Sequence, residues 1–91
     1  MERNYIMEFT HTCKGTCSRS VSFSIDENHT VTGISFYGGC SGNTQGVAKL
    51  CEGAKAEDLI ERLKGIRCGF KPTSCPDQLA TALEQALNQL N

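Results

Sequence analysis

Residues 68–77 read CGFKPTSCPD and lead from a glycine-containing loop into a predicted helix. Pro76 suits a first helical turn, where the missing backbone N–H costs little. Ser74 and Asp77 have the spacing of a capping box, with Asp in place of the usual Glu or Gln. Cys75 is therefore expected in the first turn, whose partial positive charge favours a thiolate. Apolar residues then recur at helical spacing and predict one buried face, namely Leu79, Ala80, Leu83, Ala86, Leu87 and Leu90.

Upstream, three segments alternate apolar and polar residues, which predicts strands at Tyr5–Thr10, Val21–Asp26 and Val31–Tyr37. The second strand is expected to have one wet face, because serine and aspartate occupy every other position. A polar turn at residues 26–29 would join it to the third strand as a hairpin. Gly33 marks a bulge or a close backbone approach within the third strand.

Two further helices are predicted between the strands and the C-terminal helix. The first begins near Asn43, a favoured N-cap residue, and ends at Gly53. The second covers about residues 56–64 and stops before Gly65. Three strands followed by three helices indicate an α+β fold, a three-stranded antiparallel sheet with the helices packed on one face. The strand order stays open. The residues expected to face inward from these two helices are Val47, Leu50, Cys51, Leu59, Ile60 and Leu63.

The chain has 91 residues and is expected to form a single domain over residues 1–91. Its 9 basic and 10 acidic residues nearly balance, which argues against a dedicated nucleic-acid binder. No apolar run approaches the ~18 residues of a membrane span. No apolar signal segment follows Met1, so a cytoplasmic location is expected. In that compartment the six cysteines favour a metal or redox role over disulfides.

The strongest candidate site combines Cys40, Cys68 and Cys75. Cys40 and Cys75 precede or begin predicted helices, where thiols ionise readily. A short loop joins Cys68 to Cys75, so the two side chains could approach each other. Three thiolates and one further ligand would hold zinc or an iron–sulfur cluster. Unligated thiols remain the alternative, because no CxxC pair is present. The fourth ligand would come from Cys13, Cys17, His11 or Asp77.

Cys13 and Cys17 flank Gly15 and allow three interpretations: a second metal half-site, a redox pair, or completion of the first site. Cys51 differs from them, because it falls on the inward face of a predicted helix. A cysteine in that setting behaves as a small hydrophobic residue.

The glycine-rich turn from Gly38 to Gly46 offers a second kind of site. Backbone N–H groups of Gly39, Gly42 and Asn43, just before a helix, would suit a phosphate or nucleotide. The turn lacks the sequence of a P-loop or a Rossmann fingerprint. Tight turns and close packing explain the glycines equally well.

Several motifs in one order give this chain a family resemblance. Residues 73–77 read TSCPD, and the chain resembles the TSCPD domain family from about Cys13 to Leu87. That domain occurs at the C-terminus of adenosylcobalamin-dependent (class II) ribonucleotide reductases and as small stand-alone proteins. The supporting pieces are Cys13/Cys17, ISF at 34–36, GGCSGN at 38–43 and LKGIRCG at 63–69.

The resemblance implies a link to ribonucleoside-diphosphate reductase and the supply of deoxyribonucleotides for DNA synthesis. A chain of 91 residues cannot contain the radical-generating barrel. It would therefore act as an accessory, either a metal-stabilised docking module or a thiol donor, with the reductase or another redox enzyme as partner. Whether it is itself an enzyme stays open.

Two alternatives remain beside the reductase accessory. One is a zinc or iron–sulfur carrier unconnected to nucleotide reduction, and the other is a phosphate- or nucleotide-binding module. An exposed edge strand would also offer a route to a homodimer.

Overall fold

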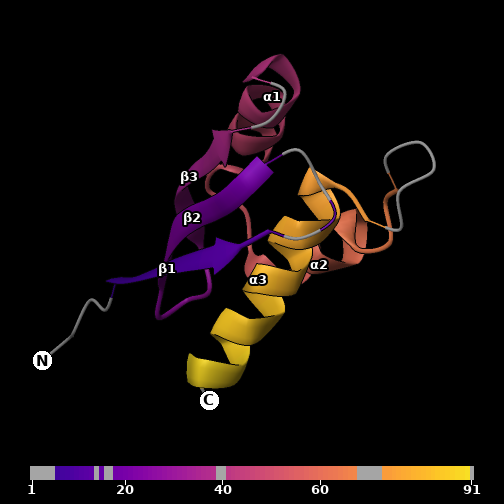
Figure 1. Cartoon of the computed structure of the whole chain (residues 1–91). Helices are drawn as coiled ribbons and strands as arrows, with labels where there is room; N and C mark the ends of the chain where they lie inside the picture. Colours follow the sequence, from indigo (N-terminus) through magenta and orange to yellow (C-terminus); the bar gives the residue numbers. More distant parts are fainter. Residues whose placement is uncertain (1–5, 14, 16–17, 39–40, 68–72, 91) are drawn as a thin grey trace, which may run out of the picture.

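A computed structural model describes residues 6–13, 15, 18–38, 41–67 and 73–90. Three strands come first, β1 (Ile6–Thr12), β2 (Ser18–Asp26) and β3 (Val31–Gly38). Three helices follow, α1 (Ser41–Cys51), α2 (Ala56–Leu63) and α3 (Cys75–Leu90) (Figure 1). The α+β prediction is confirmed, and the strand order that the sequence left open is β1-β2-β3 with both pairs antiparallel.

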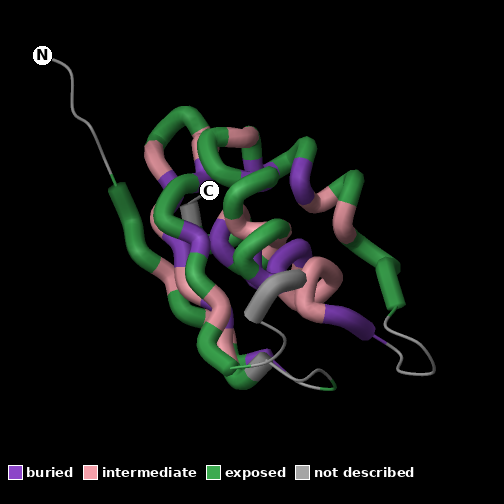
Figure 2. Tube along the Cα trace, turned by 90° about the horizontal axis from the view of Figure 1, so that it is seen from above, coloured by how far each residue is buried: buried purple, intermediate pink, exposed green. Residues whose placement is uncertain are grey.

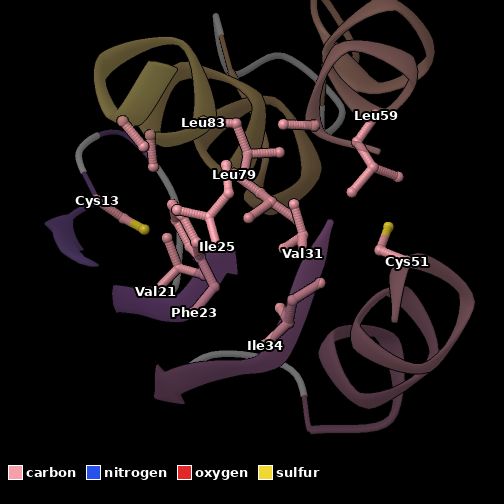
Figure 3. Close-up of a cluster of buried hydrophobic side chains, with 13 residues drawn as sticks. Cys13, Val21, Phe23, Ile25, Val31, Ile34, Cys51, Leu59, Leu79 and Leu83 are labelled. Atoms are coloured by element: carbon pink, nitrogen blue, oxygen red, sulfur yellow. The ribbon is translucent and has the colours of Figure 1, made fainter. Parts of the chain in front are cut away.

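The sheet has one apolar and one hydroxyl-rich face. Opposite residues in register, such as Phe9 with Phe23 and His11 with Val21, direct their side chains to the same face. Val21, Phe23 and Ile25 are buried there, and α3 covers them (Figure 3). The other face of the sheet carries mainly serine and threonine residues, which are exposed or half-buried: Thr10, Thr12, Ser20, Ser22, Ser24, Thr32 and Ser35.

Gly33 lies at a β-bulge, as predicted. Ser22 pairs with Ser35 and Ser24 with Thr32, so Phe23 faces two residues of β3, Gly33 and Ile34. Gly33 has φ +63, a conformation that costs glycine little and L residues more. The N–H of Gly33 donates to the carboxylate of Glu52, just after α1, at 3.0 and 3.1 Å.

The β2–β3 turn is fastened to the start of α2. The Asp26 carboxylate accepts the N–H groups of Asn28 and Thr30, both at 2.9 Å. His29 adopts φ +67, its carbonyl accepts the N–H of Ala56 at 2.8 Å, and its ring contacts the Glu57 carboxylate at 2.5 Å. This contact lowers the pKa of Glu57.

The helix predictions hold except for one predicted inward residue of α1, and the side chain of Leu90, predicted to face inward from α3, lies outside the described part of the chain. Helix α1 begins at Ser41, two residues before the predicted start, and Cys51 is buried as predicted. Leu50, however, is 87% exposed, so its predicted inward position is wrong. Among the described elements α1 packs mainly on β3, and a helix lying on one strand buries only a narrow stripe. That stripe consists of Thr44, Val47, Ala48 and Cys51.

Candidate functional site

The predicted site residues fall into two groups. Cys17, Gly39, Cys40 and Cys68 lie outside the described residues, so their predictions stay predictions. Gly42 and Asn43 lie in the first turn of α1. Cys13 follows β1, and Cys75 is the first residue of α3, as the sequence predicted.

The TSCPD stretch is a hydrogen-bonded helix start. The Ser74 hydroxyl accepts the N–H of Asp77 at 3.2 Å, which confirms Ser74 as the N-cap. In a full capping box the Asp77 carboxylate would bond back to the N-cap residue, but here it bonds to Gly65 and Thr73. One carboxylate oxygen of Asp77 accepts the N–H of Gly65 at 2.7 Å, and the other accepts the Thr73 hydroxyl. Both oxygens therefore take part in holding the start of α3.

These contacts fasten α3 to the end of α2. The Ser74 hydroxyl also donates to the Ile66 carbonyl at 2.6 Å, next to the bond from Gly65. Gly65 has φ +88, which directs the chain out of α2. The hydrogen bond from Thr73 is the largest cause that holds the pKa of Asp77 below its ordinary value, against the opposing effect of burial. The motif thus stabilises a charged carboxylate between two helices.

The same stretch is joined to the first strand. Gln78 donates to the Thr73 hydroxyl at 3.1 Å, and its amide oxygen lies 3.0 Å from Nε2 of His11 on β1. Gly15, with φ +77, approaches Thr73 so closely that a Cβ there would lie 3.0 Å from Cγ2 of Thr73. The end of β1 and the start of α3 are therefore neighbours, although the sequence separates them by most of its length.

This neighbourhood brings Cys13 and Cys75 together. Cys13 is 9% exposed, and its backbone N–H donates to the Arg19 carbonyl at 2.9 Å. Burial, and then electrostatic repulsion from Cys75, raise the pKa of Cys13 to about 11. A second negative charge near Cys13 is thus unfavourable. A soft cation between the two sulfurs would remove that penalty.

Cys51 belongs to another part of the molecule. It lies beside Val31 and Ile34 in the core, away from Cys13 (Figure 3). Burial raises the pKa of its thiol, as expected for an inert structural cysteine.

The sequence pattern indicates the proximity of Cys13 and Cys75 only in part. It offers Cys13 as one of four possible fourth ligands and also groups it with Cys17. Over the ranges that the structure describes, His, Cys, Asp and Glu side chains do not gather in threes around a possible metal position. His11 and Asp77, also considered as ligands, are engaged by Gln78 and by Thr73 and Gly65.

A cavity of about 340 Å³ lies between β3 and α1, next to the glycine-rich turn. Its lining mixes apolar and polar groups from the strand and from the helix. The residues are Ile34, Ser35, Phe36, Gly38, Thr44, Gln45 and Ala48.

Comparison with known proteins identifies one family. The family model of the TSCPD domain matches residues 3–87. No curated protein and no solved structure matches the chain. Among the helices in the described part of the chain, none has the length and apolar character needed to cross a membrane.

Proposed function

Since the chain belongs to the TSCPD domain family, we propose that it is an accessory module related to the C-terminal domain of class II ribonucleoside-diphosphate reductase. In this proposal its cysteines bind a metal, zinc or an iron–sulfur cluster, and the module serves a reductase or another redox enzyme in the cytoplasm. A reducing compartment keeps such thiols available as ligands.

The observation that supports the metal is the meeting of Cys13 and Cys75 at one end of the sheet. Burial, and after it electrostatic repulsion from Cys75, raise the pKa of Cys13, and a bound cation would favour negative charge on both sulfurs. Thiolate sulfur suits zinc and iron–sulfur clusters. The donor set therefore fits the proposed metal in kind.

Further ligands are needed, because these metals take four in a closed site. Ser18 pairs with Gly38 at the end of the sheet where Cys13 follows β1. Ser18 is the chain neighbour of Cys17, and Gly38 is two residues before Cys40. Ile66, two residues before Cys68, accepts a hydrogen bond from Ser74, the neighbour of Cys75. Together these placements support a ligand set of Cys13, Cys40, Cys68 and Cys75, with Cys17 as an alternative.

The test is elemental analysis of anaerobically purified protein, together with thermal melting in the presence and absence of a chelator. We expect about one zinc, or the iron of one cluster, per chain and a lower Tm after chelation, because metal binding contributes folding energy. Cys75→Ser and Cys13→Ser should each lower metal content and Tm together. Cys51→Ala is the matched control, since it removes a buried thiol of the core and should retain the metal.

Metal-free protein with a Tm that does not change on adding the chelator would overturn the proposal. Reversible oxidation of Cys13 with Cys17 would then favour a thiol donor.

The cavity between β3 and α1 favours a second candidate, a phosphate- or nucleotide-binding module. Gly38, Thr44 and Gln45 line it, and Gly42 and Asn43 lie in the adjoining first turn of α1. A Tm that rises with a nucleotide and ignores a chelator would favour this candidate over the metal.

A further inference from the structure

One edge of the sheet is open. The described residues supply no partner for the outer side of β1, whereas α1 packs against β3 at the other edge. In Figure 2, β1 continues from the N-terminal trace and is exposed or intermediate along its length. Ile6 is 68% and Met7 39% exposed.

The strand lacks the features that usually protect an edge. Its seven residues, IMEFTHT, contain no lysine, arginine or proline, and its pairing with β2 runs without a bulge. Glu8 is its only carboxylate. The net charge of the chain is only −1, so two copies repel each other weakly.

The backbone geometry says which groups face the open edge. The N–H of Cys13 donates to Arg19 on β2. In an antiparallel pair alternate residues point to the same neighbour, so His11, Phe9 and Met7 also direct their N–H and C=O groups to β2. The groups of the intervening residues point outward from the sheet edge. These residues are Ile6, Glu8, Thr10 and Thr12.

We propose that β1 pairs antiparallel with β1 of a second copy of this chain, with the two-fold axis at Phe9. This register overlaps the whole strand and joins the outward groups of Glu8 with those of Thr10 of the other copy, and those of Ile6 with those of Thr12. It also keeps the apolar faces of the two sheets on one side, which makes a continuous six-stranded sheet.

Side-chain chemistry favours this register over the one centred on Glu8. Phe9 meets Phe9 of the other copy in a pair without hydrogen bonds, where opposite side chains are closest. Phe9 is already stacked on Phe23, with ring centroids 5.8 Å apart, so the aromatic contact would continue across the axis. A shift of the axis to Glu8 would place two carboxylates opposite each other, which is destabilising.

The test is sedimentation equilibrium up to millimolar concentration on the full chain and on two matched variants of the exposed Thr10. The wild type should dimerise. Thr10→Glu places a carboxylate opposite Glu8 twice in each interface and should weaken the dimer by about tenfold. Thr10→Lys changes the same side chain to the opposite sign and should maintain or tighten it. The double variant Glu8→Lys/Thr10→Glu restores opposite charges and should recover the dimer.

Amide exchange gives a second readout. In the dimer the amides of Glu8 and Thr10 should become protected as concentration rises, whereas those of Phe9 and His11 are protected at all concentrations. A monomer at millimolar concentration would overturn the proposal. So would a dimer that the two Thr10 variants leave unchanged, because its interface would then lie elsewhere. A wild-type monomer whose Glu8 and Thr10 amides become protected only by another protein would point to a different partner for this edge.

Discussion

Asp77 takes part in most of the side-chain hydrogen bonds at the start of α3. Its two oxygens accept a backbone N–H of the turn after α2 and the hydroxyl of Thr73. We expect Asp77→Asn to destabilise the protein by about 1–2 kcal/mol, because the amide offers one acceptor oxygen in place of two charged ones. Chemical denaturation at neutral pH measures this, with Asp58→Asn, an exposed aspartate on α2, as the control. Equal stabilities for the two variants would contradict the structural role.

Gly15 lies close against the side chain of Thr73. We expect Gly15→Ala to cost more stability than Gly53→Ala. Both glycines have positive φ, but only the new methyl group at Gly15 meets a neighbour, at 3.0 Å, and nothing lies within 4 Å of the one at Gly53. The difference in Tm between the two variants reports the contact with Thr73, because the cost of placing alanine at a positive φ is common to both. Adding Thr73→Ser, which removes Cγ2, should recover part of the loss at Gly15, and no recovery would mean that the contact is absent.

At the scale of the element, α1 and α3 bury different amounts of apolar surface. Leu50 on α1 is 87% exposed, whereas Leu83 on α3 is completely buried against the sheet. We expect Leu50→Ala to change stability by less than about 0.5 kcal/mol and Leu83→Ala to cost about 2–5 kcal/mol. Urea denaturation of both variants checks this. A large loss at Leu50 would mean that α1 is covered by another surface, such as a second chain.

The side chain of Ser74 caps the start of α3. Ser74→Ala removes the acceptor for the N–H of Asp77 and the donor to Ile66, so we expect a loss of about 1–2 kcal/mol. Ser74→Asp retains the capping acceptor but loses the donor, so it should fall between the wild type and Ser74→Ala. Circular dichroism during thermal unfolding measures the order, and an alanine variant as stable as the wild type would contradict the cap.

At the scale of the whole molecule, stability should be highest between mildly acidic and mildly alkaline pH. Asp77 and Glu57 have lowered pKa values in the folded state, so their contribution is present above their ordinary values of 3.8 and 4.5 and is lost as the pH falls further. Cys13 and Cys51 have raised pKa values, so their contribution is present below the ordinary value of 9.0. For Cys13 it is lost as the pH rises through about 11.

The free energy of unfolding of metal-free protein, measured against pH, checks this profile. Asp77→Asn should reduce the loss of stability at acid pH and leave the alkaline side of the profile unchanged. Cys51→Ala should reduce the loss at alkaline pH and leave the acid side unchanged. A profile that stays level from pH 3 to 11 would contradict both assignments. Bound metal should shift the alkaline limb, because it replaces the proton on the Cys13 thiol.

The strands and helices could be predicted from the amino-acid sequence. Alternating apolar residues in β2, the Ser74 cap, the apolar face of α3 and the glycine at the bulge are local patterns, and local backbone and side-chain preferences govern them. The family match follows from the same local motifs.

Which distant residues come near one another depends on the packing of the elements. The electrostatic influence of Cys75 on Cys13, the hydrogen bond from Gly65 to Asp77 and the exposure of Leu50 all follow from strand order and from where each helix packs. Periodicity along one element says which of its faces is apolar, but not which other element covers that face. The outer edge of β1 follows from the same arrangement, because its open hydrogen-bonding groups exist only once β2 lies between β1 and β3.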